Sequence, residues 1–305
     1  MTEMREILPS WRDGATRESL LAFLAASADI PERERLACFD NDGTLWVERP
    51  DYVQLAFFVD ALRRAVAEDA ELASRPEYAA LLGGDVAAIG ELGLARIAVA
   101  LNELFEGMSP ELFTARVRDF MGRARHPGLD RPFGSLVYQP MLELIGELRR
   151  RSFSIAVVTG GGTEFVRAVS EELYGVPPEA VVGTLIEYDH TVEDGRPTLR
   201  RTTRVVGGAN EGAAKVVNIQ TQLGRRPVLA AGNTDGDSEM LAWVGSGPGP
   251  SLSLLVDHDD AEREFAYSGQ SVSLVGTESV LDTAGRLGWT VASIATDWDR
   301  VFPVE

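Results

Sequence analysis

Two aspartates two residues apart, Asp40 and Asp42, stand at the end of a short apolar run over residues 36–39. Such a run is typical of a buried strand in a parallel sheet, and Gly43 behind it permits a tight turn. Buried carboxylates are costly unless a cation or hydrogen bonds receive them. Because ligands bind at the carboxyl ends of strands in open α/β sheets, we expect both aspartates to face one pocket.

This acid pair suggests phosphoryl transfer through an aspartyl intermediate. Asp40 would be the nucleophile, and Asp42 the acid/base that protonates the leaving oxygen and then activates water. A hard divalent cation such as Mg²⁺ would neutralise the carboxylate so that it can approach a phosphate. Taken alone, the same residues also fit an Asp-Gly turn with an acidic cap. The remaining elements of a phosphate site must therefore decide between the two.

Residues 153–162 predict a strand that ends in a glycine-rich turn, followed by a helix over residues 164–173. The hydroxyl of Thr159 and the N–H groups of Gly160 and Gly161 could hold phosphate oxygens there. A dinucleotide site is the rival hypothesis. It fits poorly because the glycines are consecutive and no acid ends a following strand at the right distance.

Lys215 is the only lysine among 29 lysines and arginines. A chain that otherwise uses arginine would keep lysine where a compact ammonium is needed, although chance survival of a surface lysine is the alternative. Lys215 stands at the head of a predicted helix that runs to residue 223. There its ammonium could pair with Asp40 and with a bound phosphoryl group.

A further predicted strand, residues 227–232, is followed by Asn233 and Asp237. Amide and carboxylate oxygens at a strand tip suit a hard cation. The Asp-Gly-Asp run at residues 235–237 also resembles part of a calcium loop, but the terminal Glu at the twelfth position is missing. This strand tip is therefore a candidate for binding a hard cation.

With these four elements in this order, the chain resembles the haloacid dehalogenase superfamily of aspartate-nucleophile phosphatases, and within it the phosphoserine-phosphatase-like members. The resemblance implies that Asp40 is the nucleophile and a magnesium ligand. It implies that Asp42 is the acid/base, whose backbone carbonyl also ligates the metal, and that Thr159 and Lys215 hold the phosphoryl group.

The fourth motif departs from the pattern, because Asn233 stands where many relatives carry Asp. The resemblance thus leaves open whether Asn233 or Asp237 ligates the metal directly. The residues that complete the first two motifs are expected to bind phosphate: Gly43, Thr44, Gly160 and Gly161.

The acid at position 42 distinguishes this chain from related classes of the superfamily, since dehalogenases lack an acid there and P-type ATPases carry Thr. The expected activity is Mg²⁺-dependent hydrolysis of a small-molecule phosphate monoester. A phosphomutase or phosphotransferase keeps both acids and stays as an alternative. A non-catalytic protein that binds a phosphate ligand is the alternative from another class.

The expected architecture is a Rossmann-like three-layer α/β core, residues 1–46 and 138–305, with an all-helical C1-type cap over residues 47–137. Such an insertion can act as a lid that excludes water and selects the substrate. Within the cap, Ser109 and Pro110 give the start signal of a helix. Further expectations are a helix capped by Thr16, helical segments at 76–83 and 92–106, a β-hairpin over residues 181–206, and a helix over residues 261–267.

The composition excludes several partners. A net charge of −18 argues against nucleic acid and anionic membranes. No apolar stretch approaches the roughly 20 residues that span a bilayer. The first residues lack the basic and apolar pattern of a signal peptide, and the single cysteine, Cys38, falls in the first predicted strand. We expect a cytoplasmic protein.

Overall fold

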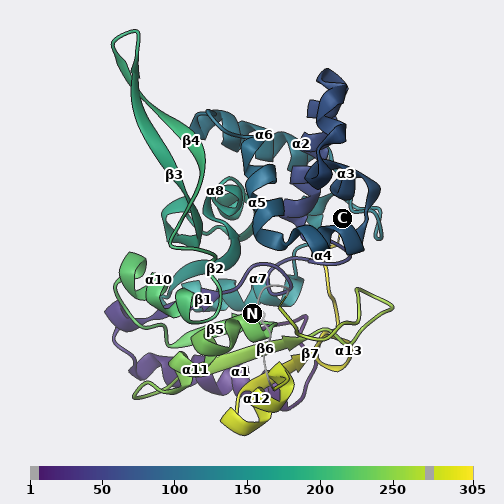
Figure 1. The fold of residues 1–305 in the computed structure, drawn as a ribbon. Coiled ribbons are helices and arrows are strands. Elements are labelled where there is room, and N and C mark those ends of the chain that lie inside the picture. The colour runs from purple at the N-terminus through teal and green to yellow at the C-terminus, as the bar shows by residue number, and fades with distance from the viewer. Residues whose placement is uncertain (1–6, 272–277, 305) are drawn as a thin grey trace.

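The computed structural model describes residues 7–271 and 278–304, and their centre is a mainly parallel sheet. Within those residues it has seven strands in the order β4-β3-β2-β1-β5-β6-β7 (Figure 1). All neighbouring pairs are parallel except β3 and β4. This arrangement confirms the expected fold class. The strands are β1 Leu36–Phe39, β2 Ser154–Gly162, β3 Val181–Glu193, β4 Arg196–Val206, β5 Leu229–Gly232, β6 Leu252–Asp257 and β7 Thr290–Ser293.

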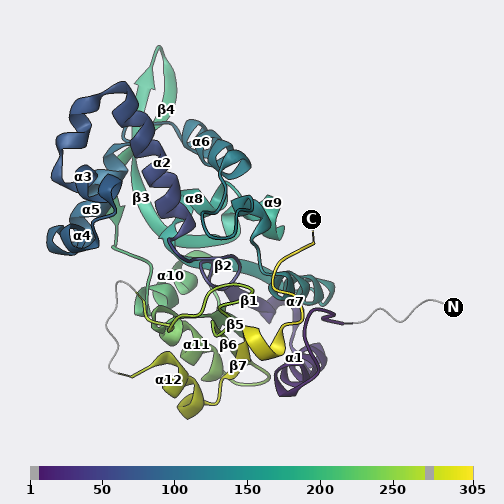
Figure 2. The ribbon, with the colours of Figure 1, turned by 90° about the vertical axis from the view of Figure 1, so that its right-hand side faces the viewer.

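The side chains of β1 alternate between two hydrophobic cores, as the pleat of a strand requires. Ala37 and Phe39 pack with α1 and α7, whereas Leu36 and Cys38 pack with α10, α11 and α12. Figure 2 shows the resulting three layers, with the first pair of helices on one face of the sheet and the other three on the opposite face. These helices are α1 Ala15–Ala26, α7 Gln139–Arg150, α10 Ala213–Leu223, α11 Ser238–Gly245 and α12 Val280–Leu287.

A block of helices between β1 and α7 lies outside these layers (Figure 1). It has its own small core, formed by Leu62, Tyr78 and Ile97 among others. Its last helix begins as predicted, because the Ser109 side chain accepts a hydrogen bond from the N–H of Leu112. The helices are α2 Val53–Glu68, α3 Pro76–Gly83, α4 Val86–Leu92, α5 Leu94–Glu103 and α6 Pro110–Arg123.

The predicted hairpin is confirmed, and it reaches the helical block. Asp194 and Gly195 form its turn with φ angles of 50° and 76°. The two long strands rise beside α5 and α6 (Figure 1). Arg201 of β4, a buried side chain, donates to Oε2 of Glu164 and to Oδ1 of Asn102, both at 2.8 Å. A buried charged contact therefore joins the sheet edge to α5.

Several predicted elements are wrong. The glycine turn after residue 159 is instead a continuation of β2 to Gly162, with a shift in pairing register between Val158 and Gly162. The expected helix 164–173 is two short helices, α8 Thr163–Arg167 and α9 Ser170–Tyr174. Glycine adopts turn and extended conformations with similar ease, so its presence in the sequence does not distinguish between them. The tight packing around this strand selects the extended conformation.

Three further boundaries differ from expectation. Residues 261–267 form turns, in which the Asp260 carboxylate accepts the N–H groups of Glu262 and Arg263. The Thr16 hydroxyl contacts the carbonyl of Val291 and the carboxylate of Asp297 instead of capping α1. The predicted segment 92–106 is α5 alone. Neither α4 nor α12 was expected, and a short helix, α13 Ile294–Asp297, follows β7.

Candidate active site

The first pair that the structure brings together is Asp40 and Lys215. Asp40 lies directly after β1, and Lys215 is the third residue of α10. The Lys215 ammonium donates to Oδ1 of Asp40 at 2.6 Å, to Oδ1 of Asp237 at 2.6 Å and to the carbonyl of Val158 at 3.1 Å. Its three protons thus have three acceptors on three elements. A planar guanidinium could not point its donors this way, which explains the one lysine of the chain.

Asp237 is held on both of its oxygens. Oδ1 accepts from Lys215, and Oδ2 accepts from the backbone N–H groups of Asn233 at 3.0 Å and Thr234 at 3.1 Å. It ends a short 3-10 turn, Asp235–Asp237, that follows β5. The geometry makes Asp237 the partner that orients Lys215.

The electrostatics of this cluster are unbalanced. Burial raises the pKa of Asp40, and the neighbouring Asp237 carboxylate raises it further, while Lys215 opposes both. Burial alone would lower the pKa of Lys215, but the carboxylates of Asp237 and Asp40 outweigh that effect and raise it. The ammonium therefore stays protonated, and the buried cluster carries more carboxylate than ammonium.

Asp42 sits in the turn after β1, and its carboxylate accepts from Nε1 of Trp46 at 2.9 Å. Burial raises the pKa of Asp42, while the hydrogen bonds from Trp46 and Asn41 act in the opposite direction. A carboxyl group whose environment favours its neutral form is suited to donate a proton. Asp40 and Asp42 both line the same cavity, as the sequence predicted.

Gly43 and Thr44 shape that turn and lie away from the cavity lining. Gly43 has φ +74°, and a β-carbon on it would stand 2.0 Å from Nδ2 of Asn233. The buried hydroxyl of Thr44 donates to Oδ1 of Asn233 at 3.4 Å. Both residues thus fit the tip of β1 against the tip of β5.

The second motif lies along the cavity in extended conformation. Gly160 and Gly161 line the cavity, and Oγ1 of the fully buried Thr159 accepts from the N–H of Gly161 at 2.9 Å. A β-carbon on Gly160 would stand 2.7 Å from Oε1 of Glu211, and one on Gly161 would stand 2.8 Å from Oε1 of Gln54. These glycines are needed for close packing, not for a turn.

The donors expected to hold a metal form a mixed set. Among the described residues, no three His, Cys, Asp or Glu side chains converge as a ready-made metal site. The expected set also includes an amide oxygen, from Asn233, and a backbone carbonyl, from Asp42. Since the buried Asp40 and Asp237 and the half-buried Asp42 lie around a single ammonium, a hard cation fits the charge and the oxygen donors of this site.

Two groups near the site were not predicted. Glu48 is buried and lines the cavity, and burial raises its pKa to about 7. His258 follows the predicted strand 252–256, where the sequence is compatible with either a contact to the site or a loop or capping role. It lies with Nε2 2.7 Å from the carbonyl oxygen of Gly43 and Nδ1 3.0 Å from Oε2 of Glu264. Tyr138 donates to the other oxygen of Glu264 at 2.8 Å. The position of His258 just after β6, at the ligand-binding edge of the sheet, was the available signal.

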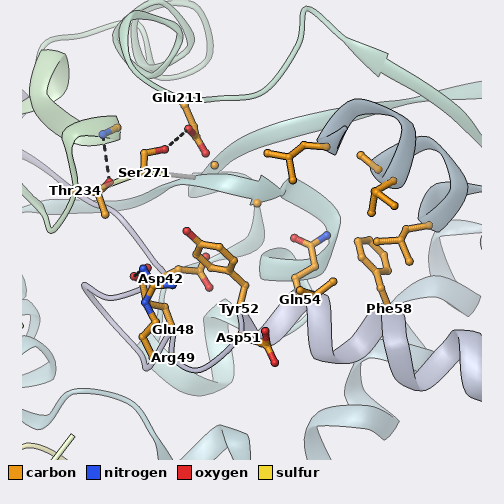
Figure 3. A pocket seen from close by; sticks show the side chains of 18 of the residues that line it. Asp42, Glu48, Arg49, Asp51, Tyr52, Gln54, Phe58, Glu211, Thr234 and Ser271 are labelled. Atoms are coloured by element: carbon orange, nitrogen blue, oxygen red, sulfur yellow. Dashed lines mark hydrogen bonds and ion pairs between the residues drawn. The ribbon is translucent and has the colours of Figure 1, made fainter. Parts of the chain in front are cut away.

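The cavity has a volume of about 550 Å³ and runs from the aspartates to the helical block. In Figure 3, Asp42, Glu48 and Arg49 lie at one side, Tyr52 and Gln54 in the middle and Phe58 at the other side. Arg123 and Arg125 do not line this cavity; Arg123 pairs with Asp60 and Asp119, and Arg125 with Asp130.

The family model described as haloacid dehalogenase-like hydrolase matches residues 37–242. No curated protein matches the chain. Among solved structures, a protein of unknown function from Bordetella pertussis Tohama I is 20% identical, with a TM-score of 0.52 over 85% of this chain and 98% of that one.

Two other similar structures have lower scores. A probable phosphoserine phosphatase from Vibrio cholerae is 15% identical, with a TM-score of 0.41 over 80% of this chain and 65% of that one. A phosphoserine phosphohydrolase-like protein from Francisella tularensis subsp. tularensis SCHU S4 is 17% identical, with a TM-score of 0.39 over 73% of this chain and 88% of that one.

Among the described residues, no helix has the length and apolar character to cross a membrane.

Proposed function

Because the chain belongs to the haloacid dehalogenase-like hydrolase family, we propose that it is a Mg²⁺-dependent phosphatase of small phosphate monoesters. One observation carries the proposal. Asp40 stands at the wall of a cavity with Lys215 bonded to it and Asp42 in the adjoining turn. These are a nucleophile, a fixed positive charge and a proton donor around one space.

In the first step, an oxygen of the Asp40 carboxylate attacks phosphorus, and the bond from phosphorus to the ester oxygen breaks. Asp42 gives its proton to that oxygen, so the product leaves as a neutral alcohol. The raised pKa of Asp42 supports this role. Lys215 offsets the negative charge that gathers when a phosphate meets Asp40.

In the second step, Asp42, now ionised, takes a proton from water, and the oxygen of that water attacks the aspartyl phosphate. The bond from phosphorus to Asp40 breaks, inorganic phosphate leaves, and the Asp40 carboxylate and the protonated Asp42 are restored.

A Mg²⁺ ion would be held by Asp40, the backbone carbonyl of Asp42 and the fourth motif. It would polarise the phosphoryl group and offset its charge. Both oxygens of Asp237 accept short hydrogen bonds, from Lys215 and from two backbone N–H groups. Among the described residues, the amide oxygen of Asn233 accepts only the long hydrogen bond from Thr44 at 3.4 Å, so it is the better candidate for the direct ligand of that motif.

We also propose that residues 47–137 act as a cap over a core formed by residues 1–46 and 138–305. Cavity-lining side chains come from both parts, which supports a shared substrate site. The contact of Arg201 with Asn102 adds the hairpin to the surfaces that support the cap.

The test is Mg²⁺-dependent release of phosphate from an aryl phosphate by wild type, Asp40→Asn and Asp257→Asn. Asp257 also ends a strand, β6, but lies outside the cavity lining, so it is a matched control. We expect Asp40→Asn to lower kcat on the order of 10⁴-fold or more. Asp257→Asn should stay near wild type. Comparable rates in wild type and Asp40→Asn would rule out the nucleophile.

A further inference from the structure

The cavity wall farthest from the aspartates is apolar. It is made by helices α2, α4 and α5, whose cavity-lining side chains are aliphatic or aromatic with the exceptions of Gln54 and Asn102. In Figure 3 these side chains gather around Phe58, beyond Tyr52 and Gln54. The apolar lining residues are Leu55, Phe58, Val86, Ile89, Leu94, Ile97, Ala98 and Leu101.

Part of this wall is open to solvent. Val86 is 80% exposed and Leu94 is 48% exposed, although both are large apolar side chains. Apolar surface gathered in a concave site is typical of ligand pockets, whereas scattered exposed residues need no explanation. Because this wall is continuous with the reaction centre, its occupant is most simply a part of the substrate.

The basic side chains of the cavity also lie away from the apolar wall. Among the described residues that line the cavity, the basic side chains are Lys215 and Arg49. Lys215 is bonded to Asp40, and Arg49 lies 3.5 Å from the Glu48 carboxylate and over the Tyr267 ring. The far wall therefore offers no cation to a second phosphate or carboxylate, and a polyhydroxylated group would lose water there without full replacement.

We propose that the substrate is a phosphate monoester of an alcohol with an extended aliphatic or aromatic group, which lies against α4 and α5. This inference rests on the proposed phosphatase function. The phosphate would be held at Asp40 and Lys215, and the apolar group would pass Tyr52 and reach Val86 and Leu94. These last two residues then determine specificity by contact with the leaving group.

The first experiment measures kcat/KM for a series of linear alkyl phosphates from ethyl to octyl. We expect kcat/KM to rise about threefold to fourfold per methylene until the far wall is covered. Leu94→Gln should flatten this rise. Leu112→Gln is the matched control, because Leu112 of α6 is 47% exposed but does not line the cavity. Its series should follow wild type.

The second experiment measures Kd for the matching alkylphosphonates, which keep the phosphate-like head and cannot be hydrolysed at the ester position. If no ester is hydrolysed but Kd falls with chain length in wild type and less in Leu94→Gln, the apolar subsite is supported and the phosphatase assignment fails. Hydrolysis with kcat/KM independent of chain length would overturn the subsite and leave the phosphatase intact. Chain-length-independent Kd would also overturn it.

Discussion

The two ends of the cavity differ in what lines them: at one end, polar groups from distant parts of the chain form hydrogen bonds with one another. At the other, apolar side chains from helices α2, α4 and α5 line the cavity. The carboxylates of Asp40 and Asp237 both accept from the ammonium of Lys215, and the three residues are 22 or more positions apart in sequence. The far wall comes from residues 55–101 and includes exposed side chains. The difference suggests that the chemistry is tied to the stability of the core, whereas specificity can change with little cost to folding.

The largest effect on stability is expected for Lys215→Met. It leaves Asp40 and Asp237 buried without their cation, and removing one partner of a buried ion pair costs about 3–5 kcal/mol. We expect the urea midpoint to fall accordingly, together with loss of activity. Arg225→Met is the control, because the half-buried guanidinium of Arg225 donates to neutral groups, the carbonyl of Arg33 and the hydroxyl of Ser154. A Lys215→Met protein as stable as wild type would show that the cluster contributes nothing to folding.

A smaller effect is expected for Gly43→Ala compared with Gly195→Ala. Both glycines have nearly the same positive φ, 74° and 76°, so the backbone strain is shared. A β-carbon on Gly43 meets Asn233, whereas one on Gly195 meets nothing within 4 Å. Gly43→Ala should therefore cost about 1–3 kcal/mol more, as overpacking does. Thermal or urea unfolding of both variants measures the difference; equal costs would mean that Asn233 simply moves aside.

The smallest effect on stability is expected at the apolar end of the cavity. Val86→Gln changes an 80% exposed side chain at the start of α4. We expect its free energy of unfolding to stay within about 0.5 kcal/mol of wild type, as for most surface substitutions. Urea unfolding measures this value. A cost well above 1 kcal/mol would indicate that Val86 packs against the protein and is not free to contact a ligand.

The reaction end was the more predictable part of the molecule. Strand ends can be recognised in sequence, and parallel strands bring their carboxyl ends to one edge. For that reason the meeting of Asp40 with Lys215 and Asp237 followed from local patterns. The Asp194-Gly195 turn and the Ser109 cap were predictable because their chemistry is local.

What failed depended on contacts between distant segments. The extended path of Gly160 and Gly161 is set by Gln54 and Glu211, which no local pattern connects to them. His258 gains its place from the Gly43 carbonyl and from Glu264. The apparent helix 261–267 even has an N-cap, because Asp260 accepts the N–H groups of Glu262 and Arg263. It does not continue, because the N–H of Phe265 donates to the Glu264 side chain and that of Tyr267 to the carbonyl of His258.

The burial of Lys215 also bears on covalent labelling. The chain has no other lysine, and this one is enclosed by carboxylates that keep it protonated. Amine-directed reagents should therefore leave every side chain of the folded protein unmodified. The same reagents would tag residue 215 once the chain opens, so one mass increment at that position counts unfolded molecules.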